Sequence, residues 1–226
     1  MTPRLPLTLL LLVAPLAAQA GLFDAENRIE LPALRTQWDG LLGRLAATDW
    51  VRAPFTEKRY FSVRRMPVVL KGDLIVSREQ GLSLHYDSAA ITGWSCVIVD
   101  QAGLLLRDEH GKELIPPGDP RVANAQRILL NVLQLDLPPL AEAFEFRATG
   151  TAGDWQIGLL PRTADARRAA TSVTLAGAGV NLQRIVLERT ATQRVEIEIG
   201  APEIGRAADA AELQARFRHP PKEAKP

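Results

Sequence analysis

Cysteine is nearly absent from this chain of 226 residues, which contains only Cys96. A single cysteine excludes a disulfide within the chain. Cys96 stands in an apolar run between Trp94 and Ile98, and no cationic residue adjoins it to stabilise a thiolate. We therefore expect Cys96 to be a small buried hydrophobic residue rather than a reactive thiol.

The sequence also lacks an excess of one charge. It has 27 basic and 26 acidic residues, and its basic clusters are no longer than the pairs Arg64-Arg65 and Arg167-Arg168. A nucleic-acid-binding surface needs a basic patch or stripe. The composition therefore predicts no nucleic-acid partner.

Residues that could catalyse a reaction or bind a metal are few. The three histidines, His85, His110 and His219, do not show a metal-ligand spacing, so the sequence predicts neither a metal nor another cofactor. Ser83, His85 and Asp87 share one face of an expected strand, but the backbones of residues i and i+2 lie about 7 Å apart. No G-x-S-x-G motif is present. We therefore predict no catalytic residues and no enzyme activity.

Long hydrophobic runs are missing except near the start of the chain. Arg4 precedes the apolar run Leu7–Ala17, and Ala18-Gln19-Ala20 fits a small-x-small cleavage pattern. The run is shorter than the roughly twenty residues of a membrane span. We therefore expect residues 1–20 to be a signal peptide that is cleaved near Ala20-Gly21 and directs the protein to the periplasm. Because Gly21 is not a cysteine, no lipid anchor is expected.

Alternation with a period of two is the strongest pattern in the rest of the chain. It begins at Val68 and, after a polar break at residues 79–81, resumes at Leu82. Such alternation predicts two antiparallel strands in a hairpin, each with one apolar and one wetter face. Further strands are predicted over residues 50–63, 94–100, 104–108, 144–149, 155–161, 171–176, 180–189 and 193–200.

Two amphipathic helices are predicted between these strands. Residues 30–48 and 121–135 carry apolar side chains at the three-four spacing of one helix face. Pro138-Pro139 is expected to end the second helix. Residues 207–218 indicate a short helix or an irregular edge, and residues 219–226 are expected to form a disordered tail.

These elements predict a mainly β fold with inserted helices, of the α+β class. About ten to eleven antiparallel strands without βαβ alternation favour an incomplete antiparallel β-barrel, because barrel curvature hides strand edges. A helical lid that closes the open side would bury the apolar helix faces. The length after the signal peptide suits a single domain, residues 21–218.

Several short motifs resemble those of the LolA-type periplasmic carriers of outer-membrane lipoproteins. Phe55-Thr56-Glu57-Lys58 resembles the F-x-Q-K strand of that family, with Glu57 in place of Gln. Gly72-Asp73-Leu74 and Arg78 follow as in the family, but Glu79 stands where a proline is usual. The resemblance continues through residues 82–86, 100–104 and 209–213, and ends at Pro220-Pro221.

The resemblance implies a carrier that holds acyl chains without covalent chemistry. It implies a half-barrel with a hydrophobic cavity and, at Arg78, an arginine that ties the barrel to its lid and controls release. The implied cargo is acylated lipoproteins or lipids, passed from an inner-membrane export complex to an outer-membrane acceptor, and we expect a monomer. From the apolar faces, the residues predicted to line the cavity are Phe55, Val68, Leu70, Leu74, Val76, Leu82, Leu84, Tyr86, Trp94, Ile128, Leu129, Val132 and Leu133.

Two other functions stay open on the sequence alone. Related half-barrels can be regulatory sensors of lipidated proteins, and a periplasmic hydrolase is a third class. A sensor would favour a second domain, for which the chain is too short, and a hydrolase needs a nucleophile beside a base. The carrier is therefore the leading hypothesis, and the departures at Glu57 and Glu79 are compatible with a specialised cargo.

Overall fold

One antiparallel sheet contains most of the regular structure. The computed structural model describes residues 21–36, 50–77, 79–89, 93–115, 127–128, 130–134, 137–204 and 216–217. The sheet has 13 strands in the order β1-β8-β9-β10-β11-β12-β2-β3-β4-β5-β6-β7, with β13 also paired to β2. Within the described residues no ladder joins β1 to β7, so the sheet is open. The predicted mainly β fold with an incomplete antiparallel barrel is confirmed.

Three strands of the sheet have only two residues: β1 (Arg28–Ile29), β7 (Glu113–Leu114) and β13 (Glu203–Ile204). None of these was predicted, since two residues show no periodicity. The remaining strands match the predicted runs within a few residues at their ends. They are β2 (Trp50–Tyr60), β3 (Val68–Ser77), β4 (Gly81–Tyr86), β5 (Cys96–Asp100), β6 (Gly103–Arg107), β8 (Phe144–Thr151), β9 (Asp154–Pro161), β10 (Ser172–Ala178), β11 (Asn181–Thr190) and β12 (Gln193–Ile199).

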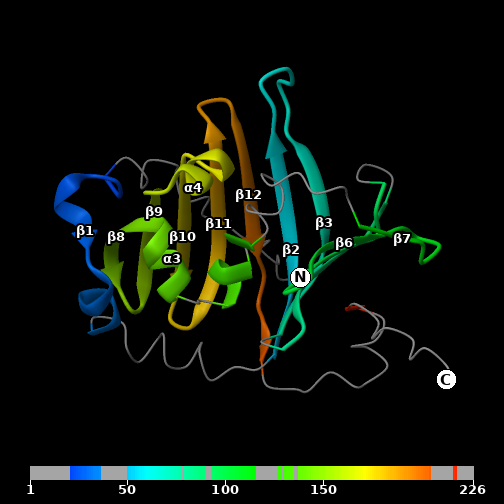
Figure 1. The fold of residues 1–226 in the computed structure, drawn as a ribbon, viewed down its shortest axis with the longest axis horizontal. Helices are drawn as coiled ribbons and strands as arrows, with labels where there is room; N and C mark the ends of the chain where they lie inside the picture. The colour runs from blue at the N-terminus through cyan, green and yellow to red at the C-terminus, as the bar shows by residue number, and fades with distance from the viewer. Residues whose placement is uncertain are drawn as a thin grey trace, which may run out of the picture.

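The sheet is strongly curved. Figure 1 shows β8 to β12 standing side by side on the left, whereas β6 and β7 run obliquely on the right. Consecutive strands pair directly from β2 to β7 and from β8 to β12, and β12 returns to pair with β2, which joins these two runs in the middle of the sheet. At the edges, β1 pairs with β8 and β13 with β2. This curvature gives the sheet a concave side, which we call the inner face, and a convex side, the outer face.

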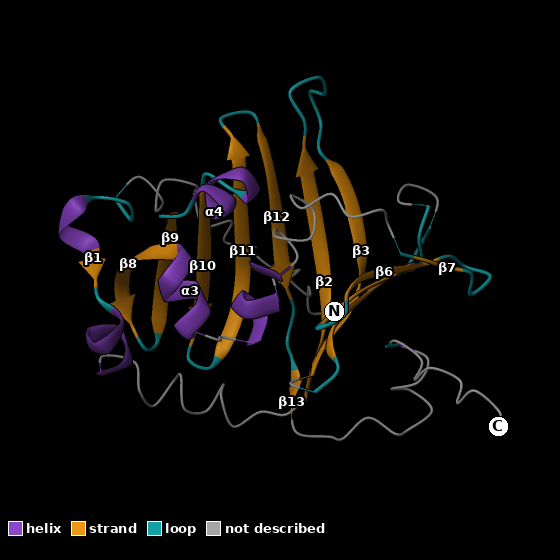
Figure 2. Cartoon of the chain, in the orientation of Figure 1, coloured by secondary structure: helices purple, strands orange, loops and turns teal. Residues whose placement is uncertain are grey.

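Short helices cover the inner face of the left half (Figure 2). They include α3 (Leu137–Ala143) and α4 (Ala164–Ala169), and the described residues 31–36 and 130–134 are also helical. Thr163 begins α4 by accepting a hydrogen bond from the Ala166 N–H at 3.1 Å, a standard N-cap contact. A 3-10 turn, η2 (Ala25–Asn27), precedes β1.

Pro138-Pro139 were expected to end the second helix, and residues 135–136, where that helix would end, lie outside the described residues. Both prolines lie in the first turn of α3, where the missing N–H groups have no helical partner to lose. The helical residues 31–36 and 130–134 agree with the two predicted helices. Residues 127–128 are helical as well, whereas Glu30 precedes its helix. Residues 37–48, 121–126, 129 and 135 of the two predictions, together with residues 1–20, 207–215 and 218–226, lie outside the described residues.

The sheet is buried on both faces. A large core on the inner face joins apolar side chains of all the longer strands except β6, with Leu104 of β6 packed against it. A second, smaller core on the outer face contains Ile75, Cys96, Ile98, Leu105 and Phe217. The sequence predicted a wetter outer face for β3 and β4. This holds at Val69 and Lys71, which are exposed, but not at Ile75, which is 0% exposed because Phe217 covers it.

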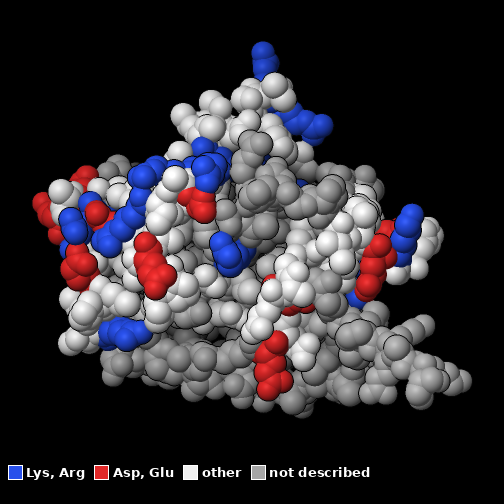
Figure 3. All heavy atoms as spheres, in the orientation of Figure 1, with Lys and Arg blue, Asp and Glu red and all other residues white. Residues whose placement is uncertain are grey.

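The solvent-exposed surface of the molecule carries mixed charge. On the face shown in Figure 3, basic and acidic side chains are interspersed over the left half. The β2–β3 hairpin stands out at the top of the molecule, and its tip exposes Phe61, Val63 and Met66 beside Arg64 and Arg65. Among the described ranges, no helix is both long and apolar enough to cross a bilayer.

Candidate ligand-binding site on the inner face

The inner face brings together most of the residues that were predicted to line a cavity. Alternation along each strand sends every second side chain to this face, where the helices of the left half pack against it. Val68 and Leu133 are partly buried against the cluster. The fully buried members among the predicted residues are Phe55, Leu70, Leu74, Val76, Leu82, Leu84, Tyr86, Ile128 and Val132.

Three predicted residues are not placed in this cluster. Trp94 is half-buried in the segment before β5 and is not among the side chains of the inner-face core. Leu129 and Arg78 lie outside the described residues, so the predicted lid contact of Arg78 stays a prediction.

A glycine creates the closest aromatic contact of the inner face. Phe55 on β2, Gly72 on β3 and Tyr86 on β4 lie in one row across three strands. A Cβ atom at Gly72 would lie only 1.9 Å from the carbonyl oxygen of His85, so this position excludes any side chain. The rings of Phe55 and Tyr86 meet edge to face above the glycine, with centroids 5.5 Å apart. The row therefore holds the Tyr86 hydroxyl in a fixed direction.

That hydroxyl points to a buried ion pair. Tyr86 Oη donates to Glu57 Oε2 at 2.8 Å, and Arg59 Nε donates to Glu57 Oε1 at 2.5 Å. The Arg59 NH2 group also donates to Tyr86 Oη at 3.3 Å. Glu57 is 5% exposed and lies between Leu70 and Ile197 of the neighbouring strands. A carboxylate in these apolar surroundings needs such partners, because an unpaired buried charge costs several kcal/mol.

The ionisation of this cluster follows from its surroundings. Burial and, second, the Glu57 carboxylate hold the pKa of Tyr86 far above its usual range, so the phenol keeps its proton and remains a donor. The Arg59 guanidinium is always charged in proteins. The Glu57 carboxylate and the guanidinium therefore cancel, and the Glu57–Arg59–Tyr86 cluster has no net charge.

Sequence reasoning noted Glu57 only as a departure from a motif and missed its burial. Thr56-Glu57-Lys58 looks like a solvated stretch when it is inspected residue by residue. The signal was nevertheless present, because Phe55 was assigned to the inner face. Period two then places Glu57 and Arg59 on the same face, two and four positions further along the strand.

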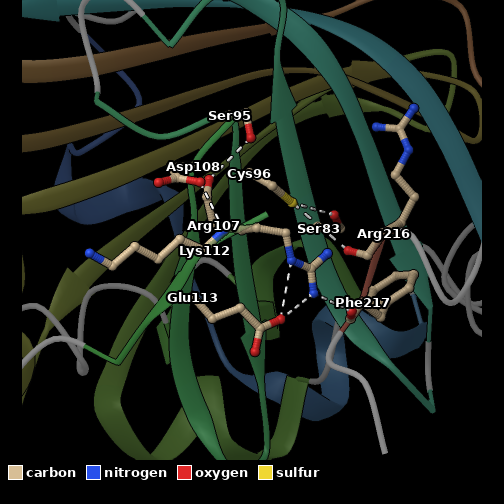
Figure 4. Close-up of polar contacts among 9 residues, drawn as sticks. All are labelled: Ser83, Ser95, Cys96, Arg107, Asp108, Lys112, Glu113, Arg216 and Phe217. Atoms are coloured by element: carbon tan, nitrogen blue, oxygen red, sulfur yellow. Dashed lines mark hydrogen bonds and ion pairs between the residues drawn. The ribbon is translucent and has the colours of Figure 1, made fainter. Parts of the chain in front are cut away.

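The outer face holds a different polar arrangement, drawn in Figure 4. Arg107 donates to Glu113 at 2.6 Å and, through the same NH2 group, to the carbonyl oxygen of Phe217 at 2.9 Å. Arg216 pairs with Asp73 at 2.9 Å. These contacts fix residues 216 and 217 over the outer-face core.

Ser83 and His85, which the sequence analysis weighed as catalytic residues, lie on this outer face. The Ser83 hydroxyl lies 3.4 Å from Cys96 Sγ, and both are buried. Cys96 is buried as expected, and this burial raises the pKa of its thiol. His85 is half-buried. Among the described residues, no three His, Cys, Asp or Glu side chains gather as a metal site.

Comparison with known proteins gives structural likenesses only. No protein-family model and no curated protein matches the sequence. A solved LolA superfamily protein from Nitrosomonas europaea is similar with a TM-score of 0.40 and 8% identity, over 76% of this chain and 96% of its own. A DUF1329 family protein from Desulfovibrio piger gives 0.44 and 6%, over 79% and 96%.

A third solved structure is an outer-membrane lipoprotein-sorting protein domain from Vibrio parahaemolyticus. It gives a TM-score of 0.42 and 7% identity, over 78% of this chain and 95% of its own. The similar structures thus include a member of the superfamily that the sequence motifs resemble. Likenesses this distant carry no argument about function, which depends instead on the residues of this chain.

Proposed function

We propose that this protein is a periplasmic carrier that binds the acyl chains of lipoproteins or lipids against the inner face of its sheet and passes them toward the outer membrane. The observation that carries the proposal is the composition of that face. It joins apolar side chains from both halves of an open sheet, and short helices rather than a second sheet cover it.

The inner face can provide the binding energy without a catalytic group. Burial of one methylene group is worth about 0.8 kcal/mol, so a single long acyl chain could contribute several kcal/mol after the costs of association. Of the helices that cover the face, α3 and α4 have seven and six residues, and α4 places only Ala166 and Ala169 in the core. Exchanging such small contacts for acyl contacts is the physical basis of the proposed uptake.

The route of the cargo belongs to the same proposal. The sequence pattern of residues 1–20 supports export to the periplasm, and the resemblance of the motifs supports hand-over from an inner-membrane export complex to an outer-membrane acceptor. Arg78 is the proposed link between barrel and lid. The chain is proposed to act as a monomer and without chemistry on its cargo.

Mass spectrometry and ligand binding test this proposal. We expect acyl lipids to co-purify with the protein expressed with its own residues 1–20, and a fluorescent fatty-acid analogue to bind the delipidated protein. A protein that carries no lipid and binds no acyl ligand would overturn the proposal.

A matched pair of variants on β3 locates the binding surface. Leu70→Asn changes a buried side chain of the inner face, whereas Val69→Asn changes an exposed side chain of the outer face one residue away. We expect acyl affinity to fall about tenfold or more in the first variant and to stay unchanged in the second. If Leu70→Asn does not fold, Val132→Phe, which fills the same core without adding a polar group, should lower affinity in the same way. Equal affinities in all folded variants would contradict binding at this face.

A further inference from the structure

The inner face contains one charged cluster among apolar side chains. The buried charged residues Arg107, Arg147 and Glu196, which belong to other ion pairs, lie on the outer face of their strands. Glu57 instead shares its face with Phe55, Leu70 and Ile197. Because this cluster lies on the face where the cargo is proposed to bind, we consider its role in recognising the cargo.

Glu57 uses both of its oxygens within the cluster, whereas Arg59 uses only some of its donors. Each oxygen of Glu57 accepts one bond, from Arg59 or from Tyr86, so the carboxylate is held from both sides. Arg59 donates its bonds within the cluster through Nε and one NH2 hydrogen, out of the five donors of a guanidinium. The Arg59 side chain is 36% exposed, whereas that of Glu57 is 6% exposed. The part of the cluster that a ligand can reach is therefore the donor end of the guanidinium.

The surroundings of Arg59 favour an uncharged acceptor. Its neighbours across β3 and β12 are Val68 and Val195, which bring no second positive charge. An anion beside the guanidinium would lose its hydration and would also meet the field of Glu57. A carbonyl oxygen loses much less hydration and accepts the same hydrogen bond.

We propose that the Glu57–Arg59–Tyr86 cluster selects cargo whose acyl chains end in an uncharged ester or amide, with the carbonyl oxygen accepting a hydrogen bond from Arg59. Free fatty acids and other amphiphiles with an anionic head are disfavoured because Glu57 cancels the charge of Arg59. This inference rests on the proposed carrier function and adds the chemical class of the cargo.

The test compares two ligands with the same chain, 1-monooleoylglycerol and oleate. Each displaces a fluorescent acyl probe from the delipidated protein at pH 8 and below its aggregation concentration. We expect the wild-type protein to bind monooleoylglycerol about tenfold more tightly than oleate, the size of one charge-assisted hydrogen bond expressed as affinity. Equal affinities, or a preference for oleate, would overturn the proposal.

Two isosteric variants separate the cluster from general effects of charge. Glu57→Gln leaves the guanidinium uncompensated, and we expect the affinity ratio to move by about tenfold or more toward oleate. Glu196→Gln is the matched control, because Glu196 is equally buried and also paired with arginine, but on the outer face. The control should leave the ratio unchanged, and an equal shift in both variants would contradict a role of the inner cluster.

A further variant keeps the proposal testable if Glu57→Gln fails to fold. Arg59→Gln gives the cluster a net negative charge, so oleate should bind even more weakly relative to monooleoylglycerol, and a rise in oleate affinity would count against the proposal. If neither ligand binds the wild-type protein, the carrier function itself fails. If both bind equally and no variant changes their ratio, the carrier function stands and the selection of uncharged heads is wrong.

Discussion

Glu57 and Glu196 lie on the paired strands β2 and β12, and each is bonded to an arginine two residues away along its own strand. Both carboxylates are 5% exposed. They face opposite sides of the sheet, because they occupy adjacent rows of the same ladder, Ile197–Glu57 and Glu196–Lys58.

The two pairs differ in how their charge is balanced. Glu196 is bonded to two arginines, Arg194 at 2.7 Å and Arg184 at 3.2 Å, and Arg194 also lies 3.9 Å from the centre of the Tyr60 ring. Two arginines therefore hold the outer carboxylate, and when one is lost the other remains. The inner carboxylate has a single cation and a phenol, so its balance depends on each partner. This difference indicates a scaffold on the outer face and a tunable site on the inner face.

The largest expected effect concerns the outer face. Phe217→Ala would empty the middle of the outer-face core, and we expect the free energy of unfolding to fall by about 3–5 kcal/mol. Cys96 should then react with a thiol reagent in the native state, while the acyl affinity of the surviving folded protein stays within about twofold. Urea unfolding and thiol-labelling rates measure the two effects. A large loss of acyl affinity would show that the two faces are not independent.

The second largest effect is expected when an arginine partner of each buried glutamate is removed. Arg59→Met removes the one cation of Glu57, and we expect unfolding free energy to fall by about 2 kcal/mol, below the usual cost for a fully buried pair because Arg59 is partly exposed. Arg194→Met should cost about 1 kcal/mol or less, because Arg184 still holds Glu196. Parallel urea titrations of the two variants measure both losses of unfolding free energy. Equal losses would mean that the inner pair is no more dependent on one partner than the outer pair.

A smaller effect is expected when the hydroxyl group of Tyr86 is removed. Tyr86→Phe keeps the edge-to-face contact with Phe55 but removes one donor to Glu57, and a loss of about 1 kcal/mol is expected. Tyr60→Phe on the outer face keeps the ring beneath Arg194 and should change stability by a few tenths of a kcal/mol. Thermal unfolding at matched ionic strength measures both. No difference between the two variants would remove the phenol from the account of the inner cluster.

The smallest expected effect depends on pH. Burial and, second, the charge of Arg216 lower the pKa of His85 below its usual value. Between its native and unfolded pKa values the unfolded chain binds more protons, so stability contributed by neutral His85 is present above about pH 6.5 and falls as the pH drops below it. His85→Gln should flatten this part of the stability curve by less than about 1 kcal/mol. An unchanged slope between pH 7 and pH 5 would show that other groups cause it.

The alternation of Leu82, Leu84 and Tyr86 was enough to predict both a strand and its inner face. Period two is a local property, and it reports which side of a strand is buried without naming the partner. It could not reveal that the opposite side of β3 is also buried. Ile75 is covered by Phe217, and no local pattern connects positions so far apart in the sequence.

Proline and single charges were less informative. Pro138-Pro139 was interpreted only as the end of a helix, and the position of α3 shows that the two prolines also begin the next one. Glu57 could have been assigned to the inner face from Phe55, but its pairing with Tyr86 depends on Gly72 allowing two aromatic rings to meet across a strand. Such a contact between three strands is a property of the assembled sheet.

The bond from Arg107 to the carbonyl oxygen of Phe217 spans 110 positions of the sequence. During synthesis at the usual rate of about 5–20 residues per second, roughly 5–20 seconds separate the appearance of these two residues. Throughout this interval the chain contains Ile75, Cys96 and Leu105 but not the side chain that covers them. A factor that shields apolar surface before folding is complete would therefore be needed most for the residues of the convex side, and loss of residues 216 and 217 would leave this surface uncovered in the folded protein.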